Sequence, residues 1–372
     1  MASRINIMEA IENVGNIQDA ELYQCTYDEG PLGPLYYGGG FGLCFSLTTK
    51  NQKKYAFKVW FNEISDIQKR LIIISDYLKK VNLPYFVTFS FLEKGLNIPS
   101  PNPEIISALK MEWIDGISLK KYVCEVMEYS KSEDEKKQKM LNLVELLKKC
   151  FKQLHDNHIS HGDLQHDNIM IVKDDTETIS IKLVDYDCLY VPTLGHCNQN
   201  TKGYSAYQHP NRTNANIGQL ASTEKDDYFS EKVIILSLYI FAYYPNVYQE
   251  IDITKNEQEF LFDNSDFNNI TNSRVYRFIK KQNPITIPKE INDLFDEIID
   301  DLQKPLTAIK SLHYLGGSKY DRPEQKDIID SDILAEFLEE QAKEKNHHTY
   351  SKTIVQTSSK PYIPNPDKYN RQ

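Results

Sequence analysis

Apolar and polar residues alternate along four stretches in the first third of the chain. The glycine-rich stretch 36–47 and the stretch 54–60 follow each other across a short polar turn, which predicts two paired strands. Two further strands are expected at 85–92 and 105–113, on either side of a loop rich in proline and asparagine. We therefore expect this part of the chain to form a β-sheet.

Apolar residues recur at helical spacing over residues 67–81, between the second and third predicted strands. Ser65 and Gln68 have the spacing of a capping box, and Pro84 follows the end of the pattern, so one helix is predicted to start at Ser65. Helical patterns dominate beyond Gly116. Helices are expected at 119–129, 135–155, 228–244, 291–302 and 331–345.

The change from sheet to helices divides the chain into four parts. We expect an N-terminal segment (1–34), a β-rich lobe with one helix (35–114), a larger helical lobe (115–345) and a polar tail (346–372). The tail has no periodic pattern, which predicts a flexible segment or one that orders on a partner protein.

Composition narrows the class of protein. The 372 residues are 40% hydrophobic and 26% charged, as in soluble globular proteins, and the formal net charge of -10 argues against a nucleic-acid binder. The six cysteines form no C-x-x-C pair, which favours free thiols, so we expect a cytoplasmic protein. The longest apolar stretch, 233–244, is too short to span a bilayer, and no membrane association is expected.

The candidate chemistry lies in two short motifs. Residues 161–168 read HGDLQHDN, and residues 183–187 read LVDYD. An acid, an amide five residues later and a second acid after a strand-like run are what phosphoryl transfer from magnesium-bound ATP requires. In this pattern Asp163 orients the attacking hydroxyl, while Asn168 and Asp185 supply oxygen ligands of the kind that Mg²⁺ prefers.

These motifs, with several others in the same order over residues 35–320, resemble the protein-kinase-like fold. The HGD form of the loop is most similar to atypical bacterial kinases, which are related both to Ser/Thr protein kinases and to aminoglycoside and choline kinases. The resemblance implies an α+β fold of two lobes, with a small antiparallel β-rich N-lobe that carries one helix and a larger helical C-lobe. It also implies that ATP and Mg²⁺ bind between the lobes.

The resemblance assigns a glycine-rich turn to the phosphates of ATP. Gly39, Gly40 and Gly42 would let backbone N–H groups approach the β- and γ-phosphates. Tyr37 stands where the family has its first glycine. A turn with only a structural role fits the same residues.

Lys58 matches the strand lysine that holds the α- and β-phosphates in this family. The family pairs this lysine with a glutamate in the middle of the next helix. Here the predicted helix offers only Asp66 near its start and Asp76 near its end. The partner of Lys58 is therefore not assigned by the sequence.

Residues 111–119, MEWIDGISL, are similar to the segment that joins the two lobes in the family. By resemblance, Met111 is the gatekeeper residue, and the backbone carbonyl of Glu112 and the backbone N–H of Ile114 bind adenine. An ordinary strand followed by a helix N-cap at Ser118 is compatible with this assignment.

Three residues depart from the pattern of Ser/Thr protein kinases. Gly162 replaces the arginine that pairs with a phosphorylated activation loop, so activation by that pairing is not expected. Gln165 replaces a lysine beside the γ-phosphate. Asp187 replaces the glycine of Asp-Phe-Gly, as in small-molecule kinases and atypical bacterial kinases. Asp187 would hold a second metal ion through water or cap the next turn.

Two further features bear on the helical lobe. Asp227 resembles an aspartate that binds the catalytic-loop backbone in the family, although a simple acid at a helix N-terminus fits as well. His155, His158, His161 and His166 are an alternative metal cluster, a weaker interpretation because no cysteine or H-E-x-x-H helix accompanies them.

The leading prediction is a cytoplasmic, bacterial protein Ser/Thr kinase that uses ATP and Mg²⁺. The alternative acceptor is a small-molecule hydroxyl, as in aminoglycoside and choline kinases, which Gln165 and Asp187 favour. A third hypothesis is a nucleotide-binding pseudokinase that acts as a scaffold, with its N-terminal segment or its tail on a partner protein.

Overall fold

The computed structural model describes the chain up to residue 312, apart from short internal gaps. The described residues are 2–31, 33–38, 41–61, 66–99, 102–199, 201–255, 259–282 and 287–312. They belong to one structural unit, Met1–Leu315. The predicted helix 331–345 and the predicted tail 346–372 lie outside the described residues.

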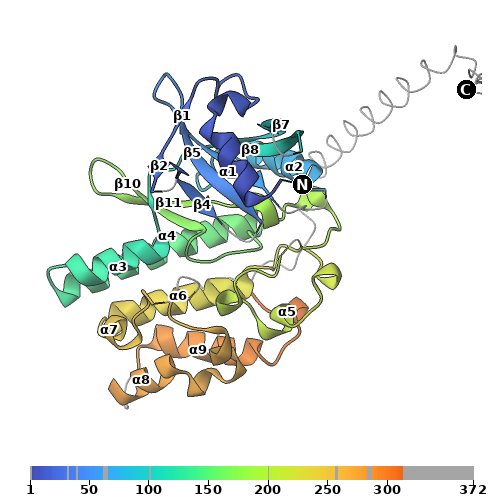
Figure 1. The fold of residues 1–372 in the computed structure, drawn as a ribbon. Helices are drawn as coiled ribbons and strands as arrows, with labels where there is room; N and C mark the ends of the chain where they lie inside the picture. Colours follow the sequence, from blue (N-terminus) through green and yellow to red (C-terminus); the bar gives the residue numbers. More distant parts are fainter. Residues whose placement is uncertain are drawn as a thin grey trace, which may run out of the picture. The chain divides into compact units, whose positions relative to one another are not determined.

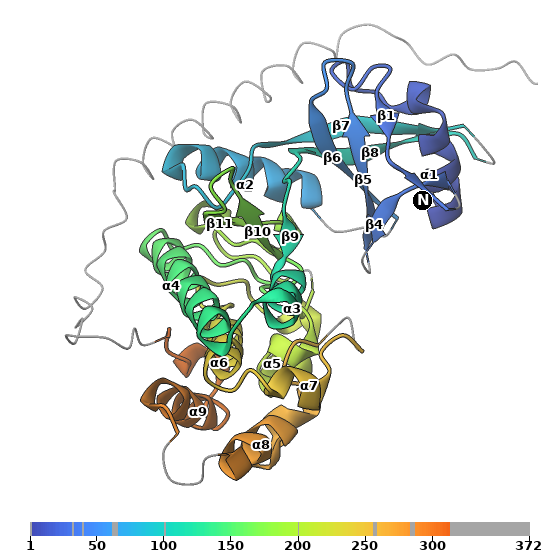
Figure 2. The same cartoon turned by 90° about the vertical axis from the view of Figure 1, so that its left-hand side faces the viewer.

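A six-stranded antiparallel sheet forms the N-lobe (Figure 1 and Figure 2). In spatial order its main strands are β1 (Thr26–Tyr27), β5 (Gly42–Thr48), β6 (Lys54–Trp60), β8 (Glu104–Glu112) and β7 (Phe89–Ile98), and β4 (Tyr36–Gly38) also pairs with β5. Tyr55, Phe57 and Val59 of β6 are buried and alternate with partly exposed residues, which is the period of two expected for a strand. The predicted antiparallel N-lobe is confirmed.

The glycine-rich stretch forms two strands, where the sequence pattern predicted one. Tyr36 of β4 lies opposite Phe45 of β5, and Gly38 lies opposite Leu43. This antiparallel pairing requires the chain to reverse direction within the stretch. A single strand over residues 36–47 is therefore wrong.

Strand β7 begins at Phe89, later than predicted. The residues before it form hydrogen bonds with the C-lobe instead. The carbonyl of Tyr85 accepts from the N–H of Leu183 at 2.8 Å, and the N–H of Val87 donates to the hydroxyl of Tyr186 at 3.1 Å. These bonds satisfy backbone groups that a longer strand would have paired within the sheet.

Helix α2 (Ile67–Val81) packs against β7. It begins after Asp66, which has a left-handed backbone with φ of 56°. The predicted capping box is wrong, because Asp66 is the N-cap; Ser65 lies outside the described residues, and Gln68 hydrogen-bonds a side chain of β7. The end of the helix at Asn82 agrees with the prediction.

The N-terminal segment belongs to the N-lobe, although no sequence pattern predicted its elements. These are α1 (Arg4–Glu12), the 3-10 helix η1 (Val14–Asn16), β1, β2 (Glu29–Gly30) and β3 (Gly33–Pro34). Ile7, Ile11 and Leu22 are fully buried in one core cluster with Phe45 and Phe57 of the sheet. The segment therefore supplies part of the N-lobe core.

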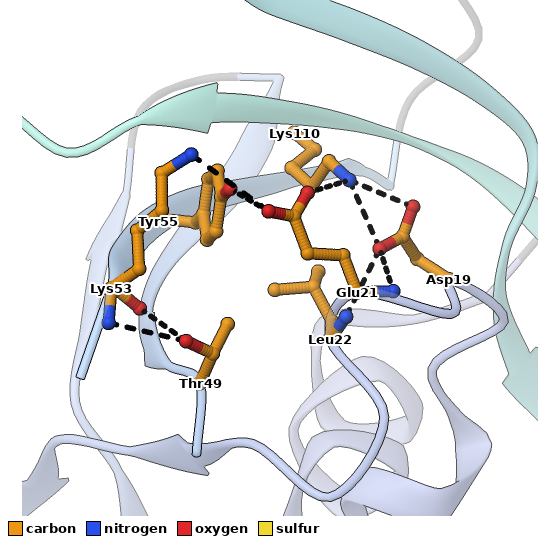
Figure 3. Close-up of polar contacts among 7 residues, drawn as sticks. All are labelled: Asp19, Glu21, Leu22, Thr49, Lys53, Tyr55 and Lys110. Atoms are coloured by element: carbon orange, nitrogen blue, oxygen red, sulfur yellow. Dashed lines mark hydrogen bonds and ion pairs between the residues drawn. The ribbon is translucent and has the colours of Figure 1, made fainter. Parts of the chain in front are cut away.

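A polar cluster fixes the same segment to the sheet (Figure 3). Lys110 of β8 forms ion pairs with Asp19 and Glu21, both at 3.0 Å. Tyr55 donates a hydrogen bond to Glu21, and Asp19 accepts from the N–H of Leu22 at 3.1 Å. Because the side chains of Lys110 and Asp19 are only 13% and 12% exposed, this ion pair is screened less than one in open solvent.

The C-lobe is helical and carries a small three-stranded sheet (Figure 1). Its strands are β9 (Ile117–Ser118), β10 (Ile169–Lys173) and β11 (Ile179–Leu183), and its α-helices are α3 (Leu119–Tyr129), α4 (Glu133–Asp156), α5 (Pro210–Thr213), α6 (Tyr228–Tyr243), α7 (Val247–Ile251), α8 (Arg274–Gln282) and α9 (Lys289–Asp301). Helix α6 is buried around almost its whole circumference, and it packs between α4 and α9. This agrees with its almost entirely apolar sequence.

Short 3-10 helices connect these elements. They are η2 (Tyr186–Cys188), η3 (Pro192–Leu194), η4 (Ser205–Tyr207), η5 (Ile217–Gln219), η6 (Asn264–Asn268), η7 (Ile270–Asn272) and η8 (Leu306–Ala308). Among the described residues, no helix has both the length and the apolar character needed to cross a membrane.

Candidate active site

The loop between α4 and β10 carries the first predicted motif. Asn168 donates from Nδ2 to the backbone carbonyl of Asp163 at 2.8 Å, so the acid and the amide of the motif lie together. The side chain of Gln165 is buried, and its amide oxygen accepts from the N–H of Asp167 at 2.7 Å. These bonds hold the loop in one conformation without help from a ligand.

Asp227, the N-cap of α6, binds the backbone of this loop. Its carboxylate accepts hydrogen bonds from the backbone N–H groups of His161 and, at 3.0 Å, Gly162. Arg212 donates to the carbonyl of Gly162 as well. Burial raises the pKa of Asp227, while the donors around it oppose this effect. Of the two roles that the sequence allowed for Asp227, the structure therefore favours binding of the loop backbone.

Asp185 follows β11 and is brought to Asn168 by backbone hydrogen bonds. The N–H of Val184 donates to the carbonyl of Asn168 at 3.1 Å. His161 is fully buried, and its Nε2 donates to the carbonyl of Val184 at 2.8 Å. The two predicted metal ligands therefore come from adjacent segments that are hydrogen-bonded to each other, and His161 helps to hold these segments together.

Lys58 reaches across from the N-lobe to this site. Its Nζ lies 2.7 Å from Oδ1 of Asp185 and 2.6 Å from Oδ2 of Asp187. Asp76, one of the two predicted helix partners, is exposed and pairs with Lys79 at 3.6 Å. The carboxylates found beside Lys58 thus belong to the C-lobe and not to α2.

The carboxylates of the site affect one another. Burial raises the pKa of Asp163, and the nearby charge of Asp185 raises it further. Burial would raise the pKa of Asp185 too, but the charge and the hydrogen bond of Lys58 outweigh it, so that pKa lies below its ordinary value. Burial raises the pKa of Asp187 despite Lys58. Two carboxylates, those of Asp185 and Asp187, contact the single ammonium group of Lys58, which leaves an excess of negative charge there.

Asn168 and Asp185 fit a hard divalent cation. The Nδ2 of Asn168 is engaged by the Asp163 carbonyl, so the oxygen of this amide remains as an acceptor on the other side. An amide oxygen and a carboxylate are ligands that suit Mg²⁺, which keeps several waters and phosphate oxygens besides. The surplus negative charge favours such a cation.

Residues 203 and 204, in the segment before α5, contact the side chain of Asp163. The N–H of Tyr204 donates to Oδ1 of Asp163 at 3.3 Å. Gly203 is so close that a Cβ atom on it would lie 2.7 Å from the same oxygen. Access to Asp163 is therefore shaped by residues 203 and 204.

The predicted adenine-binding segment follows β8. Met111 is buried opposite Ala56 of β6. The N–H of Glu112 donates to the carbonyl of Thr88 at 3.1 Å, and the next residue is tied to β6 in the same way. Ile114 lies in the following non-helical stretch, and its carbonyl accepts from Gly116 at 3.1 Å. The backbone path of this segment is thus fixed at several points.

The predicted phosphate-binding glycines are only partly described. Gly39 and Gly40 lie outside the described residues. Gly42 opens β5, and a Cβ atom there would lie 2.7 Å from the carbonyl oxygen of Val59. Close pairing of β5 with β6 is therefore by itself a reason for glycine at position 42.

Comparison with known families decides the assignment. A family model described as the protein kinase domain matches residues 38–313, which is most of the chain. The chain belongs to the protein kinase domain family. No curated protein matches it. Membership supports an ATP-dependent phosphotransferase, and ATP and a hydroxyl acceptor are its expected substrates.

Arg70 of α2 is a buried charged residue of the kinase domain that sequence reasoning missed. Arg70 of α2 is 6% exposed, and its guanidinium donates to backbone carbonyls of Cys188, Leu189 and Asn198 at 3.1, 3.1 and 3.3 Å. The signal was present in the sequence, because Arg70 lies at helical spacing between the apolar residues Ile67 and Ile74.

The histidines of the kinase domain take part in separate contacts. His155 pairs with Glu231 at 2.7 Å, and His158 pairs with Glu224. His166 hydrogen-bonds the hydroxyl of Tyr207. Within the described ranges, no group of three or more His, Cys, Asp or Glu side chains is placed to hold a metal ion. The alternative histidine metal cluster is therefore wrong for these residues.

Proposed function

We propose that this chain is a protein Ser/Thr kinase of the atypical bacterial type, which transfers the γ-phosphoryl group of ATP to a protein hydroxyl with Mg²⁺. One observation carries the proposal. Lys58 of the N-lobe bridges to Asp185 at 2.7 Å, on the segment hydrogen-bonded to the Asp163–Asn168 loop. This arrangement gathers a phosphate-binding cation, a metal ligand and a proton acceptor in one place.

Each group has a distinct task. Asp163 accepts or orients the proton of the attacking hydroxyl, and its hydrogen bond from Tyr204 fixes the direction of one oxygen. Asn168 and Asp185 hold Mg²⁺, which neutralises charge that develops on the phosphates. Lys58 binds the α- and β-phosphates. Because the transition state is loose, positioning and charge matter more here than the strength of the base.

The remaining predicted residues bind the rest of the nucleotide. Met111 lies behind the adenine, and the backbone of Glu112 and Ile114 forms hydrogen bonds with its edge. The hydrogen bonds that fix this segment support the role, because a preorganised backbone loses little entropy on binding. Gly39, Gly40 and Gly42 cover the phosphates.

The free thiols support a cytosolic location for this kinase. All six cysteines are free, and Cys150 is completely buried. Free thiols persist in a reducing compartment. Fractionation of cells that express the full chain tests this, and recovery with secreted or membrane material would contradict it.

A small-molecule acceptor is the second candidate. The observation that favours it is Gln165, which is buried and turned into its own loop, where Ser/Thr protein kinases place a lysine beside the γ-phosphate. No positive charge from this position assists transfer to a peptide.

Acceptor screening separates the two candidates. The full chain is incubated with γ-labelled ATP and Mg²⁺, once with an arrayed library of Ser/Thr and Tyr peptides and once with a panel of aminoglycosides, amino alcohols and sugars. The proposal expects label on Ser or Thr peptides. Label confined to a small molecule would transfer the assignment to the second candidate, and label on Tyr peptides alone would contradict the Ser/Thr assignment.

A further inference from the structure

Asp187 occupies a position that neither of its predicted roles describes. Its Oδ2 accepts from Nζ of Lys58 at 2.6 Å and from Nε1 of Trp60 at 2.9 Å. Both donors come from the same strand, β6, one on each side of Val59. A single carboxylate oxygen thus fixes a lysine and a tryptophan of the N-lobe at once.

The two carboxylates that contact Lys58 differ in their access to solvent. The side chain of Asp185 is 44% exposed, whereas that of Asp187 is 9% exposed. The open carboxylate is the one suited to a metal ion that arrives with the nucleotide. The enclosed carboxylate, which also accepts a hydrogen bond from the indole N–H of Trp60, is suited to hold Lys58 throughout.

Helix α2 does not supply a competing carboxylate among its described residues. Its sequence contains one acid, Asp76, which is exposed and paired with Lys79. The charged residue on its buried face is Arg70, which repels a lysine instead of attracting it. The helix that supplies a glutamate for this lysine in the family therefore carries a positively charged residue, Arg70, on its buried face.

We propose that Asp187 is the positioning residue of Lys58: together with Trp60 it holds the lysine toward the ATP phosphates, the task that a helix glutamate performs in the family. The inference rests on the proposed phosphotransferase function. It places the partner of Lys58 on the segment that follows the proposed metal ligand Asp185, and not on α2 itself. An anionic partner held at 2.6 Å and shielded from water orients an ammonium group more firmly than an exposed one.

A double-mutant cycle on turnover tests the role. Asp187→Asn keeps the shape of the side chain and removes its charge. We expect it to lower kcat/KM for ATP by at least about tenfold, and to have less than about a twofold further effect in a Lys58→Met background, because the two residues act as a unit. The concentration of Mg²⁺ that gives half-maximal rate should stay unchanged. Asp187→Glu should restore part of the rate.

Two control variants test the competing sources of a partner. Asp76→Asn changes the acid within α2, and Asp66→Asn changes the nearest acid before the helix in the sequence. Both should leave kcat/KM for ATP unchanged. A loss in either, with none in Asp187→Asn, would overturn the proposal. The proposal would also be overturned if Asp187→Asn lowered kcat/KM by the same factor with and without Lys58. If Asp187→Asn instead raised the Mg²⁺ concentration needed for half-maximal rate, Asp187 would be a metal ligand, which would overturn the proposal too.

A measurement without turnover separates failure of this inference from failure of the proposed function. In protein assayed without added nucleotide, Lys58→Met should lower the thermal midpoint, because it leaves the enclosed carboxylate of Asp187 without its cation, and adding Asp187→Asn should raise the midpoint again. A wild-type protein that transfers no phosphate but shows this recovery would contradict the proposed function alone. If the wild type is active but the double variant Lys58→Met/Asp187→Asn has a lower midpoint than Lys58→Met alone, the proposed pairing is contradicted.

Discussion

Arg70 in helix α2 donates a hydrogen bond to the backbone carbonyl of Leu189 at 3.1 Å. The same guanidinium contacts the carbonyl of Cys188 and the hydroxyl of Ser222, at 3.1 and 3.4 Å. These hydrogen bonds therefore connect an N-lobe helix to the segment that follows Asp185, the proposed metal ligand. In this kinase domain the position of α2 and the path of that segment depend on each other through one buried cation.

Removing this guanidinium should release the segment. We expect Arg70→Ala to lower the free energy of unfolding by about 3 kcal/mol, because several buried carbonyls lose their donor. Amide hydrogen exchange at residues 189–198 should become faster. Lys69→Ala is the matched control, since Lys69 is the exposed neighbour in the same helix turn. Equal effects of the two substitutions on urea unfolding would contradict the role of Arg70.

Two glycines with left-handed backbones provide a test of access to Asp163. Gly203 has φ of 74° and Gly195 has φ of 62°, so alanine is strained at both positions. Only at Gly203 would the new Cβ meet the carboxylate of Asp163, whereas nothing lies within 4 Å at Gly195. Gly203→Ala should therefore lower kcat by about a hundredfold or more, a barrier increase of about 3 kcal/mol.

Steady-state kinetics with saturating ATP measure this difference. Gly195→Ala should retain the wild-type kcat, and a thermal midpoint above the assay temperature shows that each variant is folded. A Gly203→Ala protein with wild-type kcat would show that residues 203 and 204 do not shape the approach to Asp163.

The N-terminal segment should be required for a stable N-lobe, although the family match begins only at residue 38. Ile11 of α1 is fully buried in the core cluster with Phe57, whereas Ile5 of the same helix is 68% exposed. We expect Ile11→Ala to lower the free energy of unfolding by about 3 kcal/mol, and Ile5→Ala to change it by less than about 0.5 kcal/mol. Similar denaturant midpoints for the two variants would contradict this packing.

Asp226 should make stability depend on pH. Burial raises its pKa to about 6, from an ordinary 3.8. Between these values the folded state binds a proton that the unfolded state has lost, so this residue's contribution to stability falls as pH rises from about 4 to 6. Asp226→Asn removes the effect. The stability of the variant relative to wild type should therefore increase across that window, by up to about 2–3 kcal/mol.

Chemical denaturation at a series of pH values between 4.5 and 8 measures the two proteins. The variant also loses hydrogen bonds with Thr223, which changes its unfolding free energy by the same amount at every pH. This loss shifts the difference in unfolding free energy between the two proteins but does not change how that difference depends on pH. If the unfolding free energy of Asp226→Asn relative to wild type stayed constant or fell with increasing pH, the raised pKa of Asp226 would be contradicted.

The helices were predictable where local chemistry defines their ends. Helix α3 has the predicted bounds because Ser118 caps it, with a hydrogen bond from the N–H of Lys121 at 3.5 Å. The start of helix α2 was predicted wrongly, because Ser65 and Gln68 have the spacing of a capping box although the N-cap is Asp66, which has a left-handed backbone. Propensity alone does not distinguish two adjacent polar residues as caps.

The strand boundaries depended on contacts that no local pattern contains. The residues before β7 bind the C-lobe through Leu183 and Tyr186, so they leave the sheet despite an apolar sequence suited to a strand. The N-terminal segment was missed for a related reason. Its helix has few apolar residues, and they become a core only when the sheet is beside them.

The catalytic loop was predictable because a short motif carries it, and the loop's internal bond between Asn168 and Asp163 follows from residues five apart. The partner of Lys58 was not. Asp187 lies 129 residues further along the chain, and its pairing with Lys58 arises only when the two lobes close on each other. A sequence pattern for one lobe does not include such a contact.

Transfer of label from ATP tests the central claim most directly. Purified full chain is incubated with γ-labelled ATP and Mg²⁺, beside Asp163→Asn as the inactive variant and Asp76→Asn as a surface control. The account predicts label on the chain or on an added Ser/Thr peptide for the wild type and for Asp76→Asn, and its loss in Asp163→Asn. Equal labelling of wild type and Asp163→Asn would contradict it.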